Sequence, residues 1–262
     1  MPFNLRWLVP LILAIPACDE AASSNSGGDG GEGGSASPSG PSTTGPGTGG
    51  APLNPNCQAD VTVHEGEATF YDFADGSGNC GFPATPGDLM VGAMNQADYA
   101  DSAVCGACAE VTGPDGTIKV RIVDRCPECP QGDIDLSPEA FELIAPLEQG
   151  RVDISWRYVA CGVDGPMQYH FKEGSNPFWT AVQLRNHNYA IASVEARDAG
   201  GNYNAITRLD YNYFVADSGL GEGPYVLRVT DVFGQVIEDM DIPFAENAVM
   251  PSSGQFAICA GD

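Results

Sequence analysis

Cysteine is the residue that most constrains this chain of 262 residues, because each disulfide or metal site ties together distant points of the backbone. Nine cysteines are present, and eight of them lie after residue 56. The central four form CGAC at 105–108 and CPEC at 126–129, with 17 residues between the two pairs. This spacing fits a zinc ribbon, a redox pair or a set of disulfides, so the compartment of the protein decides between them.

The N-terminus has the layout of an export signal. Residues 1–18 contain one Arg, an apolar run from Trp7 to Ile15, and small residues before Cys18. Because the run is too short for a permanent membrane span, we expect a signal peptide. Its ending, IPAC, resembles a bacterial lipobox, which predicts that Cys18 is lipidated. An ordinary secretory signal cleaved nearby is the alternative.

Export favours disulfides for the eight remaining cysteines. Thiols outside the cytoplasm tend to oxidise, and eight is the even number that four disulfides require. A redox role for CPEC is less favoured, since no βαβ pattern surrounds it. We therefore expect no metal and no other cofactor.

Residues 19–56 have the composition of a tether. Gly, Ser, Pro and Thr supply 26 of the 36 residues from 21 to 56. A segment with so little to bury cannot offset the entropy lost on ordering, so we predict that it is disordered. The remaining residues, 57–262, are enough for one or two folded domains.

The net charge of −24 and the isoelectric point near 4.1 limit the partners. Nucleic acid is disfavoured, because its phosphates need Lys and Arg. Acidic polymers are disfavoured for the same reason, and a neutral partner fits better. A simpler interpretation is that the surface acid only keeps an exported protein soluble.

The first part of the folded body, residues 57–163, mixes strands with one short helix. The helix is expected at 137–145, with Ser137 as its N-cap and Pro138 in its first turn. Strands are expected at 61–73, in a hairpin around Gly-Pro-Asp-Gly at 109–124, and at 152–160.

The second part, residues 164–262, shows no helix signals. Gly, Asn, Asp and Pro interrupt it about every ten residues, and the segments between them alternate in the manner of strands. This pattern predicts an all-β sandwich.

The motifs in these segments resemble one family. HEGEATFYDF, GNCGF, CGACAEVTGPDG, VRIVDRCPECPQGDIDLSPEAF and WRYVACGVDGPMQYHFKEGS, followed by FWTAVQLRNH, YNYFV and VLRVTD, resemble the bacterial branch of the expansin family over about residues 62–245. The resemblance implies a mainly β fold, with a six-stranded double-psi β-barrel followed by an immunoglobulin-like β-sandwich that is a family 63 carbohydrate-binding module. It also implies loosening of cellulose-containing walls without hydrolysis.

The resemblance implies a polysaccharide groove on the barrel. Its residues are Thr69, Tyr71, Asp124 and Asp135, and Asp135 takes the position that the family needs for wall loosening. Cys126 stands where some bacterial members carry a groove Tyr.

The residues themselves leave simpler roles open for the two aspartates. Asp135 lies between Ile134 and Leu136, so on a strand it points away from the core, where partial burial would raise its pKa. It could instead cap the turn before the helix. Asp124 could simply pair with Arg125.

The resemblance also implies an aromatic platform on the sandwich, with a basic residue nearby. Phe178 stands where bacterial relatives often have Trp, and because neighbours on a strand face opposite ways, a turn or bulge is needed to present it beside Trp179. Tyr211 and Tyr213 alternate along the chain and are expected to share a face, with Tyr213 as the fallback. The platform residues are Phe178, Trp179 and Tyr211, with Lys172 beside them.

By analogy with plant members, the resemblance pairs Cys80 with Cys105 and Cys108 with Cys161. The last four cysteines are then paired as Cys126–Cys129 and Cys57–Cys259. The three histidines, His64, His170 and His187, are far apart in sequence and are interpreted as structural or surface residues.

Three functions remain open. The first is a non-hydrolytic wall-loosening protein. The second is a glycoside hydrolase or lytic transglycosylase in which Asp72 is the second carboxylate for Asp135, although Asp72 also fits a simple turn residue. The third is a carbohydrate-binding tether that does not act on the wall. In each case we expect a bacterial protein that is secreted or is a cell-surface lipoprotein, and that is a monomer.

The expected partner is a cell wall polysaccharide. Cellulose, xyloglucan and mixed-linkage glucan fit, and peptidoglycan also fits an open groove. We expect no nucleic acid, and contact with a membrane only through the lipid anchor.

Overall fold

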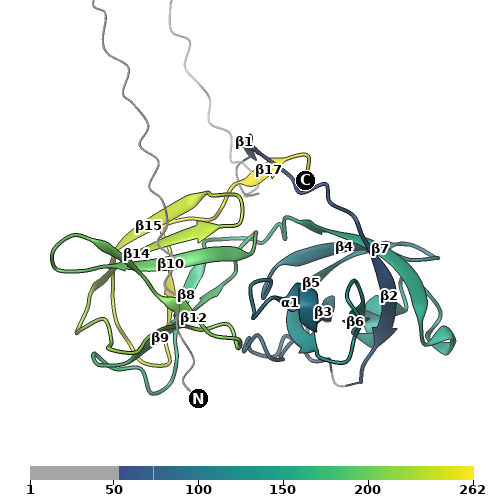
Figure 1. Ribbon diagram of the computed structural model, residues 1–262, viewed down its shortest axis with the longest axis horizontal. Helices are drawn as coiled ribbons and strands as arrows, with labels where there is room; N and C mark the ends of the chain where they lie inside the picture. Colours follow the sequence, from purple (N-terminus) through teal and green to yellow (C-terminus); the bar gives the residue numbers. More distant parts are fainter. Residues whose placement is uncertain (1–52, 73) are drawn as a thin grey trace, which may run out of the picture. The chain divides into compact units, whose positions relative to one another are not determined.

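The computed structural model describes residues 53–72 and 74–262. The described strands form a closed barrel, a pair of sheets and a two-stranded ribbon (Figure 1). The predicted signal peptide, Cys18 and most of the predicted tether lie outside the described residues. Within the described ranges, no helix is long and apolar enough to cross a membrane.

Six strands close the barrel in the order β2-β6-β3-β5-β4-β7, which confirms the predicted six-stranded barrel. β2 pairs with β6 and β3 with β5 in parallel, and the other four contacts are antiparallel. The bounds are β2 His64–Phe70, β3 Val91–Asn95, β4 Cys108–Thr112, β5 Thr117–Cys126, β6 Ile134–Leu136 and β7 Val152–Val159.

Alternation of apolar residues explains most of these strands. In β5, Ile118, Val120 and Ile122 point into the barrel core, which also contains Trp156. The predicted hairpin joins β4 to β5 through a turn in which the Gly113 N–H donates to the Gly116 carbonyl at 2.9 Å. β3 was not predicted from the sequence, because all five of its residues are buried and the period-two signal is absent.

Three short helical segments accompany the barrel: α1 Gln96–Tyr99, α2 Pro138–Phe141 and the 3-10 turn Leu147–Gln149. α2 begins as predicted, since the Ser137 hydroxyl accepts from the Ala140 N–H at 3.0 Å. It ends at Phe141 rather than at residue 145. The N–H groups of Leu143 and Ile144 donate three residues back instead of four, which tightens the chain and buries Ile144 in the barrel core. The expectation of a single helix was also wrong, because α1 is a second one.

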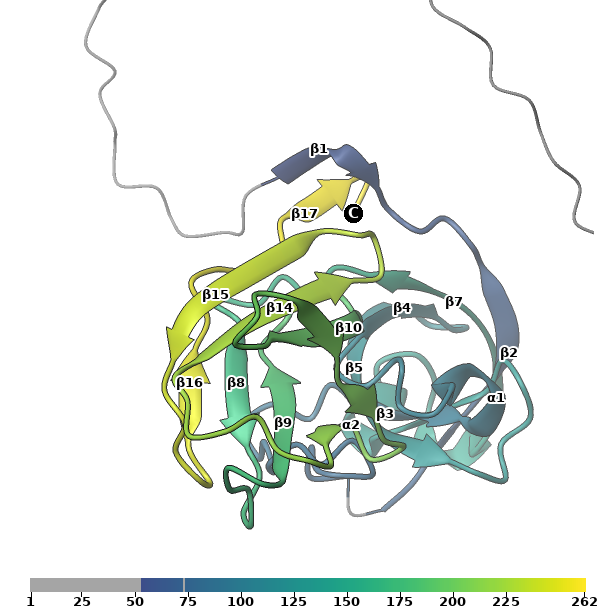
Figure 2. The same cartoon turned by 60° about the vertical axis from the view of Figure 1, so that its left-hand side comes forward.

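The second half of the chain forms a two-sheet sandwich, as predicted. One sheet has the order β11-β10-β14-β15 and the other β12-β13-β9-β8-β16 (Figure 2). Apolar residues from both sheets, such as Phe171, Leu184, Val194 and Leu227, form its core. The bounds are β8 Gln168–Phe171, β9 Thr180–Arg185, β10 Ile191–Arg197, β11 Tyr203–Ala205, β12 Thr207–Arg208, β13 Phe214–Ala216, β14 Tyr225–Asp231, β15 Val236–Ile242 and β16 Val249–Pro251.

A parallel ribbon joins the two ends of the folded body. β1 (Leu53–Gln58) pairs with β17 (Ile258–Ala260), and the two lie side by side in Figures 1 and 2. Residues 53–56, which the sequence analysis assigns to the tether, are therefore part of a strand. The pairing with β17 and the adjacent Cys57–Cys259 disulfide supply the contacts that composition alone does not reveal.

All eight cysteines of the body are in disulfides. The pairs are Cys57–Cys259, Cys80–Cys105, Cys108–Cys161 and Cys126–Cys129, the same four that the sequence analysis expects. The two CxxC motifs thus contribute to three different bridges, and their spacing is used for disulfides rather than for a zinc ribbon.

Candidate functional site

Four neighbouring barrel strands place one row of residues side by side. Thr69 of β2 is paired with Asp135 of β6, Asp135 with Ala93 of β3, and Ala93 with Asp124 of β5. Residues paired across strands point to the same face of a sheet. The row therefore brings together three of the predicted groove residues, and Ala93 between the two aspartates has only a methyl group.

Asp135 points away from the barrel core, as the alternation predicts. Its neighbours Ile134 and Leu136 are fully buried, whereas Asp135 is half-buried. The Thr69 hydroxyl donates to Asp135 Oδ1 at 2.5 Å. Burial raises the pKa of Asp135, and the Thr69 hydrogen bond opposes the shift only in part. A raised pKa widens the pH range in which the carboxyl is protonated and can donate a hydrogen bond to a ligand oxygen.

Backbone N–H groups hold the Asp124 carboxylate, and none of the ion pairs within residues 53–72 and 74–262 involves it. Its Oδ1 accepts from the N–H groups of Asn79 at 2.6 Å and Arg125 at 2.8 Å. A Cβ at Gly78 would lie 2.5 Å from Asp124 Cβ, so glycine is required there. Gly78 and Asn79 were not predicted as site residues, although both belong to the motif GNCGF.

Tyr71 follows β2 and lies near the same carboxylates. Burial raises its pKa, and the charges of Asp124 and Asp135 raise it further. Its hydroxyl is buried and has no hydrogen-bond partner within residues 53–72 and 74–262. A buried donor without a partner is costly, and a ligand hydroxyl or a water molecule can satisfy it.

Asp72 lies in the exposed turn after β2. The carboxylates whose charges raise the pKa of Asp135 are Glu128 and Asp124. Glu128 belongs to the CPEC motif and is exposed beside the Cys126–Cys129 disulfide. Asp124 also shares the row with Asp135, whereas Asp72 lies in the turn that follows β2.

A tight turn presents the aromatic residues on the sandwich. Asn176 and Trp179 exchange backbone hydrogen bonds of 2.7 and 3.1 Å, and the Asn176 side chain accepts from the Phe178 N–H at 2.9 Å. Phe178 at the tip is 81% exposed, and Trp179 is half-buried. The turn that the sequence analysis required here is present.

A second turn carries Tyr211. Asn212 has a φ of +63° and donates its N–H to the Leu209 carbonyl at 3.0 Å, so this stretch is a turn and not the alternating strand that the sequence analysis assumed. The Tyr211 and Tyr213 rings nevertheless lie in one cluster, 5.8 Å apart. Tyr213 is buried and Tyr211 half-buried, which makes Tyr211 the better-exposed ring.

Lys172 lies beside the same cluster. Its Nζ is 5.7 Å from the centre of the Tyr213 ring. Trp179 also packs against this cluster, which is centred on Ala181, Tyr213 and Val215. The structure thus brings Trp179, Tyr211 and Lys172 to one face of the sheet that contains β9 and β13. We call Phe178, Trp179, Tyr211 and Lys172 the platform, and the row with Tyr71 the groove.

The histidines occupy separate packing sites. His64 stacks on Trp156 with ring centres 4.0 Å apart, and His170 Nδ1 is 3.2 Å from the Tyr213 hydroxyl. His187 is buried, with Nδ1 2.7 Å from the Tyr189 carbonyl.

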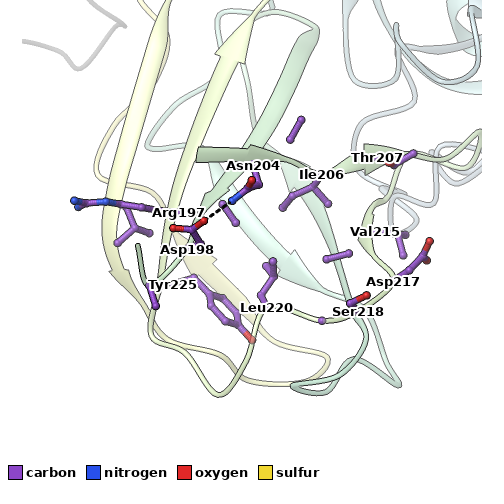
Figure 3. A pocket seen from close by; sticks show the side chains of 16 residues that line it. Arg197, Asp198, Asn204, Ile206, Thr207, Val215, Asp217, Ser218, Leu220 and Tyr225 are labelled. Carbon is purple, nitrogen blue, oxygen red and sulfur yellow. Dashed lines mark hydrogen bonds between the residues drawn. The ribbon is translucent and has the colours of Figure 1, made fainter. Parts of the chain in front are cut away.

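A cavity of about 530 Å³ opens at the edge of the sandwich, between β10, β11, β13 and β14 (Figure 3). Ile206 and Leu220 line it along with Asp198 and Asn204. The Asp198 carboxylate accepts from the Asn202 N–H at 2.9 Å and from Asn204 Nδ2 at 3.1 Å, so its polar group is already paired. The cavity contains no predicted site residue, and the groove and the platform remain the candidate site.

Comparison with known families gives a match within the barrel. A family described as "Lytic transglycolase" matches residues 63–156. Expansin-YoaJ of Bacillus subtilis (strain 168) is 36% identical over 181 residues, which cover 68% of this chain and 77% of that protein.

Solved structures give a match that extends over both halves. The apo form of the expansin of Clavibacter michiganensis aligns with a TM-score of 0.69 and 33% identity, over 74% of this chain and 98% of that one. A variant of the same expansin, crystallised in complex with cellohexaose, aligns with a TM-score of 0.69 and 32% identity over the same shares.

Proposed function

This chain belongs to the expansin family, and on that premise we propose that it binds cellulose or related β-glucans and loosens plant-type wall networks without hydrolysing them. In this proposal, residues 57–163 are the barrel domain that acts on the glucan. Residues 164–262 are the carbohydrate-binding domain that holds it.

One observation carries the proposal: a half-buried carboxyl with a raised pKa, Asp135, lies in a row with Thr69 and Asp124 on the outside of a closed barrel. Asp135 would donate to a glucan oxygen when protonated and accept from a glucan hydroxyl when ionised, while the Thr69 hydroxyl donates to the other oxygen of the Asp135 carboxyl. Exchange of glucan–glucan hydrogen bonds for glucan–protein bonds would separate chains without breaking a covalent bond.

The platform supports a neutral, flat ligand. Pyranose rings present C–H faces that pack on aromatic faces, which suits Phe178, Trp179 and Tyr211. Such contacts need no positive charge, in keeping with a net charge of −24. The cellohexaose complex of the Clavibacter expansin supports a linear β-1,4-glucan as the ligand. Xyloglucan, mixed-linkage glucan and peptidoglycan remain further partners to test.

A second candidate is lytic cleavage on the same barrel. The family description that matches residues 63–156 favours it. Asp72 is the second carboxylate expected from the sequence, and Asp124 is another, since it shares the row with Asp135. In that case Asp135 would protonate the leaving oxygen and a second carboxylate would act as base or nucleophile. A carbohydrate-binding tether without action on the wall is the third candidate.

We also propose that the protein is exported, as a monomer, and is held at the bacterial surface by a lipid on Cys18. The apolar run before Cys18 and the Gly- and Ser-rich segment after it support this location.

The test of the proposed function is a paper-weakening assay run beside cellulose depletion. The wild type should bind cellulose and weaken filter paper. Binding without weakening would favour the tether, and absence of both would contradict the proposal. Depletion on peptidoglycan and mixed-linkage glucan in parallel identifies the preferred polymer.

A further inference from the structure

The turn that carries Tyr211 is bonded to the barrel immediately before that residue. The Asp210 carbonyl accepts from Asn79 Nδ2 at 2.8 Å and from the Tyr99 hydroxyl at 3.0 Å. The Leu209 carbonyl accepts from the Ser102 hydroxyl at 2.8 Å. Three barrel side chains thus hold two consecutive carbonyls of this platform turn.

Asn79 is bonded to the groove as well. Its backbone N–H donates to Asp124 Oδ1 at 2.6 Å, while Nδ2 donates to the Tyr99 hydroxyl at 2.8 Å and to Asp210. All three of its N–H donor positions are therefore used. One residue links the groove carboxylate to the residue that precedes a platform ring.

The surroundings of Asn79 leave it little freedom. Tyr99 is fully buried, and the Cys80–Cys105 disulfide holds the next residue of the loop. The Cys80 carbonyl accepts from Gln183 Nε2 at 2.8 Å and from Asn212 Nδ2 at 3.1 Å. The loop that contains Asn79 and Cys80 is therefore held by barrel residues on one side and by sandwich residues on the other.

We propose that Asn79 is a positioning residue that holds the Tyr211 turn in register with Asp124, so that one glucan chain contacts the platform and the groove together. This inference rests on the proposed function. Two linked contacts raise the affinity for a ligand that is long enough to reach both, because the second contact forms at a high effective concentration. A short ligand gains nothing from the link.

The test compares glucans of different length on Asn79→Ala. This variant keeps the backbone N–H that holds Asp124 and loses only the side-chain link. Calorimetry with soluble mixed-linkage glucan and NMR titration with cellotriose give the two affinities. We expect the polymer affinity to fall about tenfold and the trisaccharide affinity to stay within about twofold.

Two further variants keep the test decisive. Tyr99→Phe removes the second donor to Asp210 while preserving ring packing, and should produce a smaller loss of the same kind. Asn186→Ala is the matched control, since Asn186 Nδ2 also donates to two carbonyls, those of Asp164 and Pro166, both at 2.9 Å. Asn186→Ala should lower the melting temperature of the protein and leave the ratio of polymer affinity to trisaccharide affinity unchanged.

The inference would be overturned, and the proposed function would stand, if Asn79→Ala lost the same affinity for the trisaccharide as for the polymer. An unchanged preference of this variant for the polymer would have the same meaning. A wild type that binds both glucans with equal affinity would overturn it too. A wild type that binds neither soluble glucan would overturn the inference, and the proposed function would fall with it if the protein also failed to bind cellulose.

Discussion

The groove and the platform differ in how the backbone presents their side chains. Thr69, Asp135 and Asp124 stand on paired strands of a closed barrel, where the ladder sets their spacing. Phe178 and Tyr211 stand on two turns, at 176–179 and 209–212. The strands place Thr69 at hydrogen-bonding distance from Asp135 and Asp124 two strands further on, whereas the turns expose flat rings. We therefore expect the activity of the groove to depend mainly on the positions of its side chains. We expect ligand binding by the platform to depend mainly on the aromatic area that it exposes.

Asp135→Asn should have the largest effect, because the amide nitrogen can donate to the glucan but, unlike the carboxyl oxygen, cannot exchange a proton with it or accept from it. We expect paper weakening to fall at least about tenfold while cellulose binding through the platform persists. Asp115→Asn is the control, as it makes the same change of charge at an exposed position in the hairpin loop of the barrel. Equal activity of the two variants would contradict a special role for the groove.

Removal of one disulfide at a time should distinguish a bridge that stabilises the whole fold from one that acts mainly on the loop beside the groove. Cys57–Cys259 closes 202 residues, so its loss as a double Ser variant should reduce the free energy of unfolding by about 5 kcal/mol on the chain-entropy account. Cys126–Cys129, with a separation of 3, should reduce it by about 2 kcal/mol or less. Urea unfolding measures both. The reverse order of stability would refute the account.

Acid should lower the free energy of unfolding through the buried His187. Burial lowers its pKa from 6.5 to about 4, with Arg208 and Arg121 adding to the shift. Above pH 6.5 the ring is neutral in both states. As the pH falls from 6.5 to 4, only the unfolded chain binds the proton, so stability decreases by up to about 3 kcal/mol.

Urea unfolding at pH 7 and at pH 4.5 measures this loss. His187→Gln does not titrate, so it should show a smaller loss than the wild type. The difference between the two proteins isolates His187 from the carboxylates, and no difference would mean that His187 titrates normally in the folded protein.

Phe178→Ala should have the smallest effect. The side chain is 81% exposed, so the stability of the fold should not change. Loss of one stacking contact of about 1 kcal/mol should weaken cellulose binding about fivefold. Val236→Ala, 55% exposed on β15, is the apolar control. Phe178→Trp should increase the affinity, and a loss of affinity with Trp would argue against stacking.

The orientation of Asp135 could be predicted from local patterns in the sequence, whereas Thr69, Tyr71 and Asp124 were assigned to the groove through the family resemblance. Alternation around Asp135 was sufficient, since a regular strand continues it. Alternation also predicted a strand through Tyr211 and Tyr213, and this was wrong because Asn212 adopts a left-handed conformation that no alternation reveals. β3 escaped detection since both of its faces are buried. The role of Asn79 depends on contacts with residues more than a hundred positions away, such as Asp210, and no local signal carries that information.

The central claim is that the wall weakens without cleavage of its glucans. The most direct measurement counts new reducing ends in filter paper at the time when wild-type protein has weakened it, with Asp135→Asn in parallel. The account predicts weaker paper with no ends above the level of the buffer control, and no weakening by the variant. New ends that accumulate with the wild type and disappear with Asp135→Asn would contradict it and identify a lytic enzyme.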